Sequence, residues 1–206
     1  EICTPVSTKQ DNKHISQVMA NLDAKITKND GFHIHMSSSN IPREQIVVAW
    51  LMIEPIISKC FPRSRQNNIF CRAIWKAFQN KTHPIYTYID RALTRMNNHY
   101  VAFSLEDMNR VRNTVEFRLP ESTTDPVMIQ NCIKFVYAFM KYAKIVKPTT
   151  HGHKKITSIR GVGSMVKVMD IKDQDLVKWL VQRHKQHKDA TLTKAEQKTR
   201  KKNRKS

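Results

Sequence analysis

Hydrophobic and polar residues alternate along two short segments of the chain, 31–37 and 113–119. Successive side chains of a β-strand point to opposite faces, so a period of two predicts a strand with one apolar and one polar face. The apolar face of each strand is expected to join a core. Residues 100–105 also have the character of a strand, and their closeness to the second segment favours antiparallel pairing.

Other stretches carry apolar residues at helical spacing. They predict helices over residues 11–26, 43–59, 69–78, 86–96, 127–145 and 172–188. The helix over 43–59 is apolar nearly all round, which predicts burial, and Pro55 inside it predicts a kink or an early end. Asp125 followed by Pro126 is typical of a helix N-terminus. These elements together predict an α+β fold, with a mostly antiparallel sheet and packed helices.

The helix over 127–145 is expected to pack on the sheet. The residues predicted to face inward recur every three or four positions and include Val127, Ile129, Ile133, Val136, Tyr137 and Met140. After this helix the chain passes through polar loops, and residues 160–163 predict a basic turn.

The polar faces of the two strands carry chemically active groups. His33 and His35 share one face of the first strand, and Glu116 and Arg118 share one face of the second. We expect all four side chains to line one pocket, on the side of the sheet away from the helix over 127–145. Two imidazoles, a carboxylate and a guanidinium would suit a metal-bound phosphate substrate. A solvated strand face would explain either pair alone, so the pattern by itself leaves both interpretations open.

The composition of the chain predicts a single domain followed by a basic tail. At 206 residues and 40% hydrophobic content, the chain can bury a single substantial core. The formal net charge is +19, and residues 185–206 hold nine Lys or Arg and two acids with almost no large apolar side chain. We expect residues 189–206 to be a disordered basic tail that contacts nucleic acid non-specifically.

Cysteine spacing and hydropathy indicate the compartment. The four cysteines show no metal-binding spacing, so we expect reduced thiols in a cytoplasmic protein. No apolar run reaches the roughly 18 residues of a membrane span, and no signal peptide is visible, so no membrane partner is expected.

Several short segments resemble motifs of the amidoligase family, in the same order and with the same spacing. The resemblance extends from residue 1 to about residue 143, and its motifs lie at 1–6, 31–36, 65–71, 100–105 and 114–119, with the helix start at 123–125. It implies a carboxylate–amine ligase with a glutamine-synthetase-like fold that uses ATP and Mg²⁺. In such a reaction a carboxylate takes the γ-phosphate of ATP, and an amine then displaces phosphate from the acyl phosphate to give an amide.

The resemblance also implies roles for individual residues. Carboxylates suit divalent cations, and planar guanidinium groups suit two-point contact with phosphate or carboxylate. Arg65 and Arg118 would therefore contact the nucleotide phosphates or the substrate carboxylate. The residues implied to hold metal are Glu1, Glu116 and His33, and those implied in catalysis are Glu116, Arg118, His33 and His35.

The chain departs from the family at its beginning. The family's opening strand carries a G-x-E-x-E pattern with further metal-binding carboxylates, which is absent before Glu1. We therefore expect residues 1–147 to form an N-terminally incomplete ligase-like core that lacks this strand. A helical extension over 148–188 and the tail over 189–206 would follow it.

Three functions remain open on sequence alone. The first is an amide ligase acting on a small-molecule or peptide carboxylate and an amine. The second is an inactive ligase-like scaffold that binds nucleic acid through its basic surface and tail. The third is a metal-dependent hydrolase built on His33 and His35, which would want further His or Asp ligands on later strands.

Overall fold

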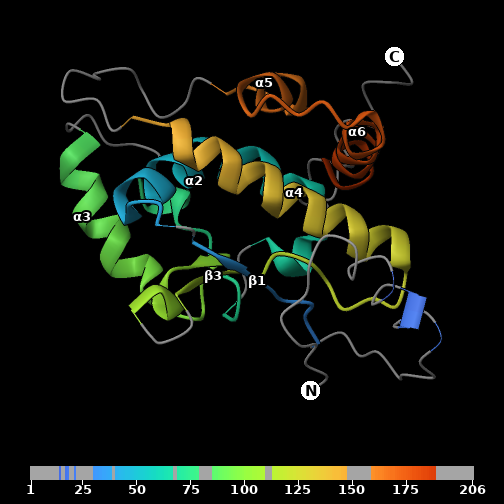
Figure 1. The fold of residues 1–206 in the computed structure, drawn as a ribbon, viewed down its shortest axis with the longest axis horizontal. Coiled ribbons are helices and arrows are strands. Elements are labelled where there is room, and N and C mark those ends of the chain that lie inside the picture. The colour runs from blue at the N-terminus through green and yellow to red at the C-terminus, as the bar shows by residue number, and fades with distance from the viewer. Residues whose placement is uncertain are drawn as a thin grey trace, which may run out of the picture.

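The fold is α+β, with a small antiparallel sheet of three strands and, in the part of the chain described, five α-helices, α2 to α6 (Figure 1). The computed structural model describes positions 14, 17, 18 and 21 and residues 30–38, 40–66, 69–78, 85–109, 113–147 and 159–188. The motif at 1–6, most of the helix predicted over 11–26 and the basic tail over 189–206 lie outside these residues.

The sheet consists of β1 (Ile34–Ser37), β2 (Phe103–Ser104) and β3 (Thr114–Phe117), in the order β1-β3-β2. Both neighbouring pairs are antiparallel, as expected for β2 and β3. The strand predicted over 100–105 is reduced to two residues. Its first part bonds instead to Arg72, whose N–H donates to the carbonyl of Tyr100 and whose carbonyl accepts from the N–H of Ala102.

Four of the five α-helices, α2, α3, α4 and α6, confirm predicted helices. Their bounds are α2 Arg43–Ile57, α3 Ile85–Met96, α4 Pro126–Ile145, α5 Val162–Val168 and α6 Gln174–Lys188. Helix α2 continues through Pro55 and ends two residues later, where a 3-10 turn (Ser58–Cys60) takes over. Asp125 caps α4 as predicted, because its Oδ1 accepts the N–H of Val127 at 2.9 Å.

Two local predictions are wrong. The helix expected over 69–78 is only the 3-10 turn Trp75–Phe78, because the backbone before it pairs with residues 100–102. The basic turn expected over 160–163 is instead the start of α5, with Gly161 as the extended N-cap residue. Two further 3-10 turns carry polar residues used below, Arg63–Arg65 and Glu106–Asn109.

The core lies between the sheet and the helices that cover its apolar face. Trp50 of α2 stacks on Phe103 of β2, with ring centroids 4.7 Å apart, and meets Phe139 of α4 edge to face. Phe117 of β3 packs against Phe135 of α4 in the same cluster. Figure 1 shows α4 and α2 lying together over the strands. The apolar strand faces predicted from alternation are therefore confirmed.

The prediction for the inward face of α4 is confirmed in part. Of the residues expected to face the sheet, Ile129, Val136 and Met140 are buried, whereas Val127 is 57% exposed and Tyr137 is 49% exposed. The buried face also includes Met128, Cys132, Phe135, Phe139 and Tyr142. The large Phe135 and Phe139 rings fill the space against Trp50 and Phe117.

Helix α6 packs on the same core as the sheet and α2. Leu176 and Leu180 are buried in the core cluster, and the Cys60 thiol donates to the Leu180 carbonyl at 3.6 Å. Arg183 donates to the Cys60 carbonyl at 3.0 Å and pairs with Glu121 at 2.5 Å. Within the described residues, no helix has both the length and the apolar character that crossing a bilayer requires.

Candidate functional site

The four polar strand residues predicted from alternation meet on one face of the sheet. Register pairs His35 of β1 with Glu116 of β3, and Arg118 follows two residues after Glu116 on the same face. His33 precedes β1 by one residue and reaches the same carboxylate. The apolar neighbours Val115 and Phe117 point into the core, toward α2 and α4. These four residues, called here the Glu116 cluster, thus lie on the sheet face away from α4.

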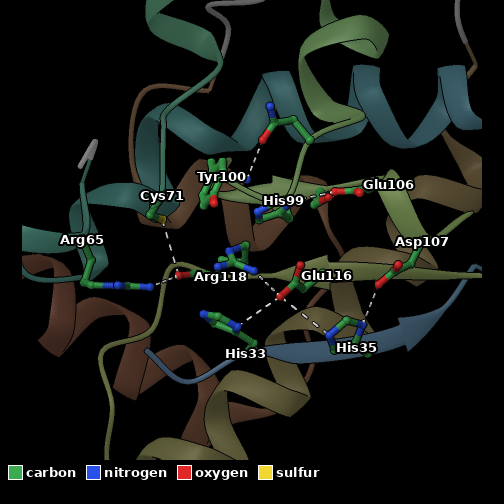
Figure 2. A network of polar contacts seen from close by, with 12 residues as sticks. His33, His35, Arg65, Cys71, His99, Tyr100, Glu106, Asp107, Glu116 and Arg118 are labelled. Atoms are coloured by element: carbon green, nitrogen blue, oxygen red, sulfur yellow. Dashed lines mark hydrogen bonds and ion pairs between the residues drawn. The ribbon is translucent and has the colours of Figure 1, made fainter. Parts of the chain in front are cut away.

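One oxygen of Glu116 joins the other three residues of the cluster (Figure 2). Its Oε1 accepts from Nη1 of Arg118 at 2.6 Å and lies 3.1 Å from Nδ1 of His33 and 3.7 Å from Nε2 of His35. Among the described residues, Oε2 has no hydrogen-bonding or ionic partner. Glu116 therefore has one oxygen fixed by cationic or imidazole groups and one oxygen left for a further ligand.

The surroundings of Glu116 hold it ionised. Burial alone would raise the pKa of this carboxyl, but the hydrogen bond with His33 and the positive charge of Arg118 outweigh burial, and the pKa lies below its usual value. An ionised carboxylate accepts hydrogen bonds and binds metal cations, whereas a protonated one does neither well. The cluster thus keeps its central residue in the form that binding chemistry requires.

Asp107 belongs to this group but was missed in the sequence. It lies in the 3-10 turn Glu106–Asn109, and its Oδ2 is 3.4 Å from Nδ1 of His35. The two ring nitrogens of His35 therefore face two carboxylates, those of Asp107 and Glu116. The segment was interpreted as a plain connection between strands, and it has no periodicity that could have indicated this contact.

Arg65 reaches the site from a different part of the chain. It is only 4% exposed, and its Nη2 donates to the Arg118 carbonyl at 2.5 Å. The same carbonyl accepts from the Cys71 thiol at 3.4 Å. A Cβ on Gly31 would lie 2.9 Å from both Arg65 Nη2 and His33 Nε2, so the glycine leaves room for these two side chains to meet. Arg65, Arg118 and His33 are therefore neighbours, as the predicted shared site requires.

Two guanidinium nitrogens at the site are buried without an acceptor. Among the described residues, Nε of Arg65 and Nε of Arg118 have no hydrogen-bond partner. Arg65 also makes no ion pair with a carboxylate in the described part of the chain. Buried donors and buried charges are normally paired, because leaving them unpaired costs free energy. This imbalance indicates a place for an anionic ligand.

Cys71 does not supply a nucleophile. Burial raises the pKa of its thiol to about 12, so the thiol stays protonated at neutral pH. Cys71 is therefore a buried structural residue, and its thiol donates to the Arg118 carbonyl.

The predicted metal set remains a prediction. Glu1 lies outside the described residues. Within those residues, no group of three or more His, Cys, Asp or Glu side chains is arranged to hold a metal ion. A hollow of about 270 Å³ lies elsewhere, lined by residues that include Arg72, Arg95, Asn98 and Val101, and it contains none of the predicted site residues.

Comparison with known proteins agrees with the motifs. A family model described as "putative amidoligase enzyme" matches residues 1–140. The chain belongs to the amidoligase family. No curated protein and no solved structure matches it in the corresponding comparisons.

Proposed function

We propose that this protein is a carboxylate–amine ligase that uses ATP and Mg²⁺ and forms an amide through an acyl phosphate, on a fold of the glutamine-synthetase type. Family membership supports a ligase in general terms. The observation that carries the specific proposal is the convergence of Arg65 and Arg118: the Arg65 guanidinium donates to the Arg118 carbonyl, and the Arg118 guanidinium pairs with Glu116. Among the described residues, each guanidinium keeps one buried N–H without an acceptor, which suits an anionic substrate.

The residues of the candidate site fit a nucleoside triphosphate and its cation. The unpartnered Nε–H donors of Arg65 and Arg118 suit phosphate oxygens, for which the planar guanidinium is well shaped. Mg²⁺ in nucleotide sites is commonly held by one or two protein carboxylates together with phosphate oxygens and water. The free Oε2 of Glu116 fits that role, and Glu1 is the further carboxylate that the resemblance implies.

In the proposed mechanism each residue has a distinct task. When bound, ATP with Mg²⁺ supplies the phosphoryl group that activates the substrate carboxylate. Arg118 and Arg65 would hold anionic oxygens and oppose the negative charge that develops during phosphoryl transfer. Glu116 would hold the cation through Oε2, while Arg118 and His33 fix its other oxygen. His33 and His35 are partly exposed, and would accept the proton that the attacking amine loses.

The test is ATP consumption by the protein with pooled carboxylates and amines, followed as ADP and phosphate release. Glu116→Gln should abolish the metal-dependent turnover, because it removes the charge with little change of volume. Arg118→Lys should also turn over poorly, because lysine cannot make the two-point contact. Asp175→Asn is the control: it removes a carboxylate charge from an exposed residue of α6 that pairs only weakly, at 4.0 Å, with Lys178. Full activity in Glu116→Gln, with the control equally active, would remove Glu116 from the mechanism.

A further inference from the structure

Three aromatic rings gather on the surface beside the Glu116 cluster. Phe70 is 47% exposed, Tyr100 is 41% exposed, and the His99 side chain is 50% exposed. The Tyr100 ring centroid lies 3.8 Å from that of His99 and 6.2 Å from that of Phe70. Large exposed rings that touch one another are uncommon on a surface that serves no binding function. These three residues are called here the aromatic platform.

Strand pairing brings the segment of the platform close to the catalytic candidates. Ser104 of β2 pairs with Glu116, and the Ala102 carbonyl accepts the N–H of Arg118. Tyr100 lies in the turn just before this segment, two residues from Ala102, so the chain that carries the platform begins next to Arg118. Figure 2 shows Tyr100 and His99 next to Arg118.

The backbone fixes the rings in place. The N–H of Arg72 donates to the Tyr100 carbonyl at 2.9 Å, which joins the segment of Phe70 to that of Tyr100. Nδ1 of His99 lies 3.1 Å from Oε2 of Glu106, which orients the imidazole. The Tyr100 N–H donates to Oδ1 of Asn98 at 2.7 Å. The platform is therefore held by contacts from both of its chain segments.

We propose that the aromatic platform binds the planar base of the nucleotide, with Tyr100 as its principal stacking surface. This inference rests on the proposed function, because it assumes that the phosphates of the same nucleotide lie at Arg65 and Arg118. Tyr100 is two residues from Ala102, so their Cα atoms are at most about 7 Å apart, and a ribose spans that separation. Purine rings stack on aromatic faces without needing specific hydrogen bonds. The platform thus gives the nucleotide a base subsite separate from its phosphate subsite.

Binding of two ligands that differ only in the base and sugar tests this proposal. Calorimetry with Mg²⁺ would measure the Kd of ATP and of inorganic tripolyphosphate for the full chain. Tyr100→Leu should weaken ATP binding by about five- to tenfold and leave tripolyphosphate binding unchanged, since stacking of one base commonly accounts for such a factor. Tyr100→Phe, which keeps the ring, should stay within about twofold of the wild type for both ligands. Tyr137→Leu, at an equally exposed tyrosine on α4, is the matched control and should change neither Kd.

The outcomes separate the two proposals. If Tyr100→Leu weakens ATP and tripolyphosphate equally, or changes neither, the platform does not bind the base, while ATP binding by the wild type still supports the ligase. If the wild type binds neither ligand, the proposed function fails and the platform proposal fails with it. Circular dichroism and a thermal melt of each variant would show that a changed Kd does not come from unfolding.

Discussion

Nδ1 of His33 lies 3.1 Å from Oε1 of Glu116, although the two residues belong to separate motifs at opposite ends of the sheet-forming sequence. The contact exists because β1 and β3 are antiparallel neighbours in the sheet. Arg118 binds the same oxygen from the same strand as Glu116. Each of the two sequence patterns predicts only a polar strand face, and the sheet brings the two faces together in one cluster. The charges of this cluster determine how the protein should respond to mutation and pH.

Loss of the Glu116 charge should destabilise the fold as well as the site. Glu116→Gln leaves Arg118, whose side chain is only 12% exposed, without its ionised partner. We expect the free energy of unfolding at pH 7 to fall by about 1–3 kcal/mol. Because the folded-state pKa of Glu116 is depressed, its stabilising effect is present above the ordinary carboxyl pKa and is lost as pH falls through the folded value. Urea titrations at several pH values should show that the difference in unfolding free energy between wild type and variant becomes smaller at acidic pH. A constant difference across pH would contradict this account.

Gly31 should be needed for the site more than for the fold. In Gly31→Ala the new methyl would lie 2.9 Å from Arg65 Nη2 and His33 Nε2, both ends of flexible side chains. We expect these side chains to move apart, ATP and tripolyphosphate to bind several-fold more weakly, and stability to change by less than about 1 kcal/mol. Gly163→Ala is the control, because a Cβ there meets nothing within 4 Å and alanine favours the helix it lies in. Unchanged binding in Gly31→Ala would show that the close approach has no role in the site.

The buried carboxyl of Glu54 should make stability fall as pH rises. Glu54 is inaccessible in α2 and accepts the backbone N–H groups of Ile74 and Trp75 at 3.1 and 2.7 Å. Burial raises its pKa from 4.5 to about 7, against the opposing effect of these N–H groups. The folded state therefore holds a proton that the unfolded state releases between pH 4.5 and 7, and stability should decrease across that window.

The size of the effect follows from the shift. A pKa shift of this size corresponds to a loss of at most about 3 kcal/mol in the free energy of unfolding between pH 4.5 and 7. Glu54→Gln should flatten this part of the stability profile, whatever its effect on absolute stability. Denaturant unfolding in matched buffers would measure how the unfolding free energy changes with pH in wild type and variant. Equal slopes in the two proteins would assign the pH dependence to another group.

Helix α6 should be an integral part of the folded unit, although it lies beyond the residues that the family model matches. Leu180 is fully buried in the core cluster, so Leu180→Ala should cost about 2–5 kcal/mol. The neighbouring Val181 is 50% exposed, and Val181→Ala should change stability by less than about 0.5 kcal/mol. Thermal melts of the two variants make a direct comparison. Equal, small effects would indicate that α6 is a separate appendage.

The basic C-terminal segment should govern binding to polyanions. Residues 185–206 hold nine Lys or Arg, and contacts of these groups with phosphates release counterions. Binding to a single-stranded oligonucleotide should therefore weaken steeply with salt, by about 0.7 log units per phosphate contact for each tenfold rise. Deletion of residues 189–206 should remove most of this binding and leave ATP turnover unchanged. Salt-insensitive binding that survives the deletion would place the nucleic-acid contact on the folded part.

The sequence by itself determined the local features whose physical cause is local. A period of two predicts which face of a strand carries His33 and His35, or Glu116 and Arg118, because the pleat alone sets side-chain direction. The Asp125 cap and the start of α4 likewise depend on a few adjacent residues. The family motifs indicated the class of protein, and the family match over residues 1–140 confirms it.

Tertiary structure alone decided which of these features meet. Arg65 reaches the Arg118 carbonyl, Asp107 reaches His35, and the rings of Phe70 and Tyr100 touch, because strand register and chain crossings bring distant segments together. The same reason decides which residues of α4 are buried, since the Phe135 and Phe139 rings fill the core while Val127 and Tyr137 stay exposed. The periodicity of a segment depends only on residues that are close to one another in the sequence. Contacts between segments depend on packing, which no single segment specifies.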